Sequence, residues 1–371
     1  MNSISLIRNP FAALALALPL SFGGALSGCA GMSSSSQPMA ETPASSSGFV
    51  YTANEREDSI SRIDLATGQV TTMSVPVTPH NVQISRDGSR LFVVGSMAGQ
   101  MRMVATPAAP AGDGHAASEQ PGGLLILDAA ASNAASATLV QVGRGPAHVI
   151  VDRPAARAYV SNSDDDSVSV VDTARDRVVG SIATAASPHG LRMSPDGREI
   201  YVAATKGNAV SIIDVATSRE VTRVPVGRAP VQVGFTPDGM RVYISLRDDN
   251  AVAVVDTRTR RLVTTIKVGR SPIQVFSTPD GNFMYVANQG TEQEPDNTVS
   301  VIDIRLNAVV KTLTTDRGAH GVVVGDNGSQ VFVANTFAGT VSTIDAATQR
   351  VVGTFRVGKG PGGITYRPAQ R

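Results

Sequence analysis

The sequence predicts an all-β fold, a seven-bladed β-propeller whose blades are four-stranded antiparallel sheets. The first observation is a hydrophobic pair or triplet ending in aspartate that recurs seven times, with successive aspartates 64, 44, 42, 42, 47 and 42 residues apart. A period of about 42 residues is the length of one propeller blade. The second observation is a repeated Asp-Gly or Asn-Gly turn, which suits hairpins between antiparallel strands. The seven aspartates are Asp64, Asp128, Asp172, Asp214, Asp256, Asp303 and Asp345.

Each repeat contains the same segments in the same order. An aromatic-led strand, such as IYVAAT at 200–205, is followed by a Val/Ser/Ile strand that ends at the aspartate. A Val/Thr strand with Val-Gly comes next, then a P-x-G turn, a fourth apolar strand and the Asp-Gly turn. The strands are apolar at almost every position, which indicates that both faces of each sheet are buried between neighbouring blades. Because aspartate favours turns, we expect the recurring aspartates to be turn residues.

The two ends of the repeat array predict how the ring closes. The first unit begins at Phe49 with the aromatic-led strand, and the chain ends in GGITYRP (362–368), the strand that should precede it. One C-terminal strand should therefore join three N-terminal strands in the closing blade, which leaves no long sheet edge. We place the propeller at residues 49–371.

The N-terminus indicates export and lipid anchoring. Arg8 precedes an apolar stretch, 11–20, that is too short to span a bilayer, and Leu-Ser-Gly-Cys at 26–29 resembles the bacterial lipobox. We predict a signal peptide at 1–28, a diacylated Cys29, and a flexible Ser/Pro-rich tether at 29–48. The residue that follows the cysteine is Ala30 and not aspartate. In many Gram-negative bacteria this choice resembles the outer-membrane sorting signal. The expected location is the outer membrane, with a monomeric propeller facing the periplasm.

Composition and motifs exclude several function classes. Cys29 is the single cysteine, so a disulfide within the chain is excluded, and a formal net charge of +1 provides no field that attracts polyanions. The sequence contains no G-x-S-x-G elbow, phosphate loop, H-E-x-x-H or C-x-x-C-H motif. We therefore expect neither haem nor a nucleotide as a cofactor.

Three segments carry a resemblance to a known family. YVANQGTEQEPDNTVSVID (285–303), SPDGREIYVAATKGNAVSIIDVAT (194–217) and VGKGPGGITY (357–366) resemble the YVTN-type β-propeller repeat of YncE-like periplasmic proteins. The resemblance covers 49–371 and implies the propeller fold. It leaves function open, because related rings serve as binding modules, lactonases, lyases and cofactor-bearing domains. It also implies nucleic-acid binding as one alternative.

Four of the five histidines fall in the P-x-G turn of the repeat, where they should rim one mouth of the central channel. Counted from the turn proline, His80, His189 and His320 share one position, and His148 lies one residue later. Because side chains alternate along a strand, this register predicts three equivalent imidazoles and one that is displaced. Imidazole is a good ligand for Zn or Cu. Either the histidines form a metal or ligand site, or P-H-G is only a common form of this turn.

Two further groups of residues give weaker hypotheses. The insertion 97–122 holds Met97, Met101 and Met103 with His115 downstream, and thioether sulfur suits Cu(I), although methionine is also an adaptable apolar filler. Together with a shorter insertion at 289–296 and the acidic loops 164–166 and 248–249, it should lie on the face of the histidines.

The second group is a basic arc. It includes Arg258, Arg260 and Arg261, which could contact nucleic-acid phosphates. The chain has no tryptophan and only 4% aromatic residues, and single-strand binders usually add aromatic stacking platforms. A solubilising surface is the alternative interpretation.

The sequence thus favours a lipid-anchored binding or scaffolding module over an enzyme, with an unidentified protein or small molecule bound at the histidine-rimmed face. One alternative is a Cu- or Zn-binding protein or a metal-dependent lactonase or lyase. The other is a nucleic-acid binder.

Overall fold

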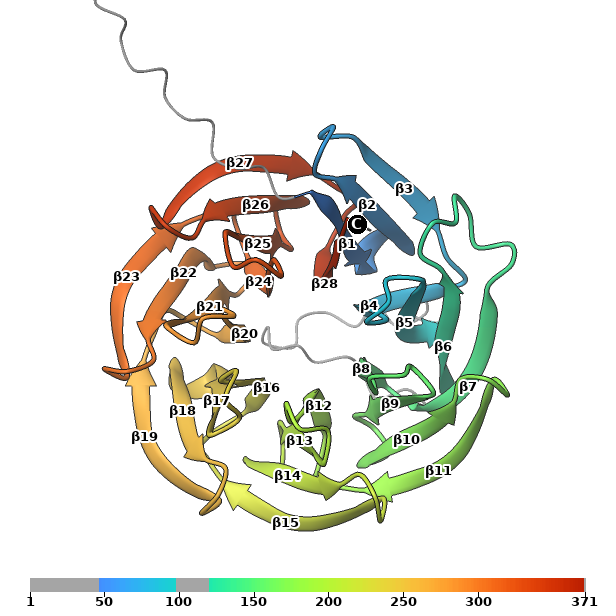
Figure 1. The fold of residues 1–371 in the computed structure, drawn as a ribbon, viewed down its shortest axis with the longest axis horizontal. Helices are drawn as coiled ribbons and strands as arrows, with labels where there is room; N and C mark the ends of the chain where they lie inside the picture. Colours follow the sequence, from blue (N-terminus) through green and yellow to red (C-terminus); the bar gives the residue numbers. More distant parts are fainter. Residues whose placement is uncertain (1–46, 98–119, 370–371) are drawn as a thin grey trace, which may run out of the picture. The chain divides into compact units, whose positions relative to one another are not determined.

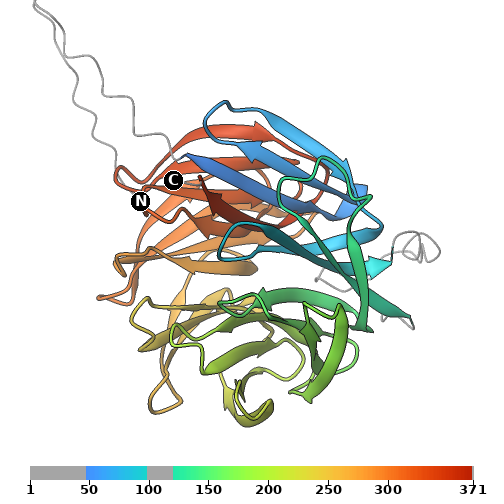
Figure 2. The same ribbon diagram turned by 45° about the vertical axis from the view of Figure 1, so that its right-hand side comes forward.

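The computed structural model describes residues 47–97 and 120–369, which form seven four-stranded antiparallel sheets arranged in a ring (Figure 1). The predicted seven-bladed propeller is confirmed. Each inner strand contacts the inner strands of the two neighbouring blades, so these strands surround a central channel. The oblique view shows that the sheets of the ring are twisted (Figure 2).

The strand bounds follow the repeat. The first four blades, from the inner strand outward, are β28 (Pro361–Pro368), β1 (Gly48–Asn54), β2 (Ser59–Asp64) and β3 (Val70–Ser74); β4 (Val77–Ile84), β5 (Arg90–Met97), β6 (Pro121–Asp128) and β7 (Thr138–Arg144); β8 (Pro146–Val151), β9 (Arg157–Asn162), β10 (Ser167–Asp172) and β11 (Arg177–Ala183); β12 (Pro188–Met193), β13 (Glu199–Ala204), β14 (Ala209–Asp214) and β15 (Arg219–Pro225). The other three are β16 (Pro230–Phe235), β17 (Arg241–Leu246), β18 (Ala251–Asp256) and β19 (Arg261–Lys267); β20 (Pro272–Ser277), β21 (Phe283–Gly290), β22 (Pro295–Asp303) and β23 (Ala308–Thr314); β24 (Ala319–Val324), β25 (Gln330–Asn335), β26 (Thr340–Asp345) and β27 (Arg350–Arg356).

The closing blade combines the two ends of the repeat array as predicted. Strand β28 pairs antiparallel with β1, with Phe49 opposite Arg367 and Val50 opposite Tyr366. Strand β1 begins at Gly48, one residue before the predicted start. The pairing joins the last repeat to the first and leaves no open blade edge at the seam.

The core consists of clusters between adjacent blades. The aromatic residue that leads the second strand of each blade is fully buried in all seven blades, and apolar side chains of neighbouring sheets surround it. These aromatic residues are Tyr51, Phe92, Tyr159, Tyr201, Tyr243, Tyr285 and Phe332. Burial on both faces of every sheet explains why the strands are apolar throughout.

The recurring aspartates end the third strands and hold the next turns, as predicted. The Asp64 carboxylate accepts hydrogen bonds from the backbone N–H groups of Ala66 and Thr67, and Asp214 accepts one from Thr217. Side-chain oxygens of aspartate satisfy turn N–H groups in this way. The aspartates are therefore structural and lie apart from the candidate site.

The Val-Gly element of the repeat also has a packing reason. A Cβ at Gly143 would lie 2.5 Å from Cγ of Asn162, and one at Gly269 would lie 2.5 Å from Cγ of Asn288. These buried asparagine amides bridge two hydroxyl groups of the third strand, as Asn162 does with Ser167 and Ser169. Glycine leaves room for that amide.

The strand directions give the ring two distinct faces. Inner strands begin at the P-x-G turn on one face and end at the Asp-Gly turn on the other. The helical segments among the described residues include two 3-10 turns, Glu55–Glu57 and Arg247–Asp249, on the face where the inner strands begin. Among residues 47–97 and 120–369, no helix has the length and apolar character needed to cross a membrane.

Candidate functional site

Four histidines stand at the beginnings of inner strands, at one end of the channel. His80 lies on β4, His148 on β8, His189 on β12 and His320 on β24. Their exposed fractions are 7, 1, 7 and 6% respectively. The predicted rim of histidines is therefore buried inside the channel mouth and does not stand out in solvent.

Three of these imidazoles converge. The ring centroids of His80 and His148 are 5.6 Å apart, those of His80 and His189 are 5.2 Å apart, and those of His148 and His189 are 4.9 Å apart. One ring nitrogen from each residue lies within 4.8 Å of the other two. The three residues come from consecutive inner strands, β4, β8 and β12, so the repeat itself places them side by side.

The group differs from the one that the register predicts, because His148 takes the place expected for His320. Pairing shifts register at all four histidine slots, as between Pro79 and Asn81 and between Pro146 and Val149. A β-bulge breaks the alternation of side chains and redirects the residue at the irregularity. The one-residue offset of His148 consequently does not turn its ring away from the channel.

His320 lies outside this group of three. Its Nδ1 is 3.2 Å from the carbonyl oxygen of Gly362 on β28, the inner strand that separates β24 from β4. It still adds positive potential at His148.

Hydrogen bonds to the outer ring nitrogens orient two of the imidazoles. Nδ1 of His80 is 3.4 Å from Oε1 of Glu55, and Nδ1 of His189 is 3.2 Å from the carbonyl oxygen of Val231. A carboxylate and a carbonyl only accept hydrogen bonds, so each Nδ1 carries a hydrogen and each neutral Nε2 presents a lone pair. These two Nε2 atoms face each other at 3.3 Å. Facing lone pairs repel unless a proton or a metal cation lies between them.

His148 is oriented by an amide. Oε1 of Gln232 accepts the N–H of Val233 at 2.9 Å, which directs Nε2 of Gln232 to within 3.3 Å of Nδ1 of His148. In this arrangement the neutral His148 carries its hydrogen on Nε2. Ligation through Nε2 requires the hydrogen to move to Nδ1 and the Gln232 amide to turn its oxygen toward it. His80 and His189 are thus preset for a cation, whereas His148 is not.

Burial dominates the ionisation of His148. Desolvation holds the pKa of His148 well below its ordinary value of 6.5, and positive potential from His189, His80 and Arg192 acts in the same direction. The imidazole therefore stays neutral in the folded protein at pH values where the unfolded chain binds a proton. Neutral imidazole is the form that ligates a metal.

The lowered pKa predicts acid sensitivity of the metal-free protein. The folded pKa lies below the unfolded one, so the stability contribution is complete above pH 6.5 and is lost as pH falls below it. As the pH falls below 6.5, we expect protonation of His148 in the unfolded chain to lower the unfolding free energy by up to about 1.4 kcal/mol per pH unit. Chemical denaturation in the presence of a chelator should show this slope, and His148→Gln should reduce it by one proton. Equal slopes for the two proteins would contradict the assignment.

A rim of contacts lies beside the histidines on the same face. Arg56, next to Glu55, forms a two-pronged ion pair with Glu292 of the 289–296 insertion, at 2.9 and 3.1 Å. The Arg56 guanidinium also lies over the Phe337 ring, 5.7 Å from its centroid. The turn that carries Glu55 is thereby tied to two other blades.

Other predicted site residues lie apart from this cluster or outside the described residues. Met97 ends β5, whereas Met101, Met103, His115 and Cys29 lie outside the described residues. The acidic loops pair with neighbouring turns, as Asp165 does with Arg144 and Asp249 with Arg228. They hold the loops of the histidine face together.

The predicted nucleic-acid residues follow β18 on the opposite face. Arg260 pairs with Glu199. Arg258 lines a cavity of about 190 Å³ whose walls include Asp196 and Glu199. Arg261 begins β19. The carboxylates beside Arg258 and Arg260 reduce the positive potential that a polyanion would meet.

Sequence reasoning missed Glu55 and Gln232 as partners of the histidines. Gln232 occupies the turn position of His148 two blades away, so the repeat alignment offered a signal. Glu55 comes from a turn of another blade, and no pattern in the sequence pointed to it.

Two family models match parts of the chain. The cytochrome D1 heme domain matches residues 133–289, and the YNCE-like beta-propeller matches residues 220–368. With the seven-bladed ring, the second match confirms the predicted resemblance to YncE-like propellers. No curated protein matches the sequence.

Solved structures share the fold at low identity. A hydrazine synthase chain from Kuenenia stuttgartiensis is 20% identical with a TM-score of 0.65, and the match covers 80% of this chain and 96% of the other. A functionally unknown protein from Desulfotomaculum acetoxidans is 16% identical with a TM-score of 0.69, and the match covers 87% and 100%. A putative 6-phosphogluconolactonase from Bacteroides uniformis is 14% identical with a TM-score of 0.67, and the match covers 86% and 99%.

Proposed function

We propose that this YncE-like seven-bladed propeller is a binding module for a single Zn or Cu ion, held by His80, His148 and His189 at one end of its channel. The observation that carries the proposal is the pair of Nε2 atoms of His80 and His189, which face each other at 3.3 Å. A shared proton would satisfy two nitrogens. The third imidazole within 4.8 Å favours a metal ion, which takes three or four ligands.

The distance between these two nitrogens fits a small tetrahedral ion. Two nitrogens 3.3 Å apart subtend an angle of about 105° at an ion with bonds of ~2.05 Å, close to the tetrahedral value. The hydrogen bond from Nδ1 of His80 to Glu55 matches the carboxylate–histidine–metal arrangement that orients ligands in zinc sites. Glu55 is a positioning residue in this proposal.

The match to the cytochrome D1 heme domain raises the question of whether these histidines bind haem. The same geometry does not fit haem ligated by both His80 and His189. Two protein ligands of a haem iron lie on opposite sides of the macrocycle, near 180°. His80 and His189 would instead lie at about 105° on one side of a shared ion. His80 and His189 together therefore do not fit a haem ligated by two histidines.

A titration tests the proposal. The chelator-treated propeller should bind one Zn²⁺ or Cu²⁺ per chain with a submicromolar dissociation constant, measured by calorimetry and by metal analysis after desalting. Binding to the folded state alone should raise the unfolding free energy by about 4 kcal/mol at an ion concentration 1,000 times the dissociation constant. Absence of stoichiometric binding by both metals would overturn the proposal.

A metal-dependent enzyme is the second candidate, because three protein ligands leave a fourth position for water or substrate, as in catalytic zinc sites. One similar structure is named a putative 6-phosphogluconolactonase. Lactone turnover that requires the metal would favour this candidate over a binding module.

The N-terminal sequence further supports the proposal that lipidated Cys29 tethers the propeller to the outer membrane.

A further inference from the structure

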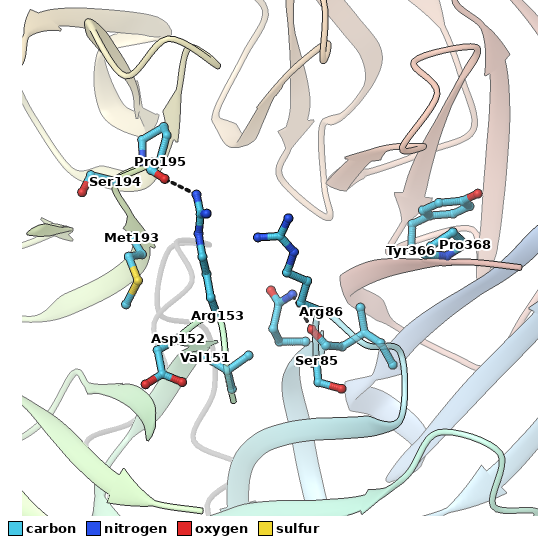
Figure 3. A pocket seen from close by; sticks show the side chains of 12 residues that line it. Ser85, Arg86, Val151, Asp152, Arg153, Met193, Ser194, Pro195, Tyr366 and Pro368 are labelled. Atoms are coloured by element: carbon cyan, nitrogen blue, oxygen red, sulfur yellow. Dashed lines mark hydrogen bonds between the residues drawn. The ribbon is translucent and has the colours of Figure 1, made fainter. Parts of the chain in front are cut away.

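The other end of the channel contains a basic cavity that the metal site does not use. Its volume is about 360 Å³, within the range of small-molecule sites, and the ends of four inner strands, β28, β4, β8 and β12, surround it. Figure 3 shows the side chains of Arg86 and Arg153 extending into this opening from adjacent strand ends.

The Arg86 guanidinium has its donors available. Within residues 47–97 and 120–369, it forms neither an ion pair nor a hydrogen bond, and it is exposed at the mouth. Arg153 uses Nη2 to donate to the carbonyl oxygen of Pro195, a bond that fixes its direction across the opening (Figure 3). A guanidinium presents five donors, so this single bond leaves most of them free for a ligand.

The one carboxylate in the lining faces its own turn. Oδ1 of Asp152 accepts the backbone N–H groups of Ala156 and Arg157, and Figure 3 shows the carboxylate away from both guanidinium groups. The cavity therefore keeps a positive end, formed by Arg86 and Arg153.

A third arginine, Arg192 on β12, lies one residue before Met193 of the cavity lining. Nη1 of Arg192 donates to its neighbour's carbonyl, that of Leu191, and its guanidinium lies 5.9 Å from the Phe276 ring centroid. Among the described residues, it pairs with no carboxylate. Burial lowers the pKa of Arg192 to about 10, so the group stays charged at neutral pH. A partly buried charge without an acidic partner is costly, and a nearby anion would offset part of that cost.

We propose that this mouth binds a small molecule through an oxyanion, a phosphate or a carboxylate, held by the guanidinium groups of Arg86 and Arg153. Paired arginines recognise both groups through two-pronged hydrogen bonds. The site is separate from the histidines. His80 lies four residues before Ile84, the last residue of β4, roughly 13 Å at the usual rise, and Arg86 lies beyond Ile84 in the turn.

Calorimetry on the metal-free full propeller tests the proposal, with inorganic phosphate and citrate as separate probes. We expect one of them to bind. Arg86→Gln and Arg153→Gln should each weaken that binding by about tenfold, the loss expected for a charge-assisted hydrogen bond. Asp152→Asn keeps the Oδ1 acceptor and should strengthen binding about twofold to fivefold, because it removes the one negative charge.

Arg198→Gln is the matched control. This arginine lies on the same face, its side chain is 85% exposed, and it is absent from the cavity lining. Its substitution should change affinity less than twofold. Three results would overturn the proposal: no binding of either probe, equal losses in Arg198→Gln and Arg86→Gln, or binding of a single-stranded oligonucleotide alone. Because Arg86 and Arg153 are remote from the histidines, failure here leaves the metal titration unaffected.

Discussion

His189→Ala is expected to lower the affinity of the propeller for Zn²⁺ by about two to three orders of magnitude. Apparent binding energies of ~10–16 kcal/mol for four-ligand zinc sites correspond to roughly 2.5–4 kcal/mol per ligand, and 1.4 kcal/mol is a tenfold change. His189 supplies one of the two facing Nε2 atoms, so its loss also removes the arrangement that favours a cation. Competition with a chromophoric chelator measures the change.

His320→Ala is the control for this experiment. His320 occupies the same turn position and is buried to a similar degree, with an exposed fraction of 6% against 7% for His189. It lies outside the converged group, so its substitution should change affinity less than threefold. If both variants lose the ion equally, the histidines act only through the fold. If neither does, the ion binds elsewhere in the chain.

Gly190→Ala is expected to cost about 3 kcal/mol of unfolding free energy and to weaken metal binding as well. A Cβ at Gly190 would lie 2.4 Å from Oε1 of Gln232 and 2.5 Å from the carbonyl oxygen of Val231. That carbonyl orients His189, and the Gln232 amide orients His148. One methyl group would therefore displace the supports of two ligands. Chemical denaturation and the zinc competition assay measure the two effects.

Gly353→Ala provides the comparison for stability. Gly353 lies on the outer strand β27, and a Cβ there would meet no atom within 4 Å. The substitution should change the unfolding free energy by about 0.5 kcal/mol or less and leave zinc binding intact. A similar loss in both variants would show that the packing against Gln232 and Val231 carries no special cost.

The sequence predicted the architecture because each repeat carries its own local signals. The Asp-Gly turns, the aromatic-led strands and the spacing of about 42 residues specify one blade at a time. The phase of Phe49 against 362–368 specified which strands close the ring, and β28 pairs with β1 accordingly. These features depend on residues close together in the chain, so periodicity reveals them.

The membership of the histidine group required the tertiary structure. Alternation along an ideal strand predicts His80, His189 and His320. The register shift occurs at all four histidine slots, and His148 joins His80 and His189 because β4, β8 and β12 are consecutive inner strands, whereas β28 separates β24 from β4. A bulge depends on pairing between strands, and the P-x-G turn alone does not show which way its ring will point.

The chain by itself determined the repeat, the ring closure and the end of the channel at which the histidines lie. Only the tertiary structure decided which imidazoles meet, that Glu55 and Val231 set two Nε2 lone pairs against each other, and that Arg86 and Arg153 share a cavity at the opposite mouth. The physical reason is how far apart in the sequence the interacting residues lie. Blade formation is encoded within about 42 residues, whereas these contacts join side chains from different blades around the ring.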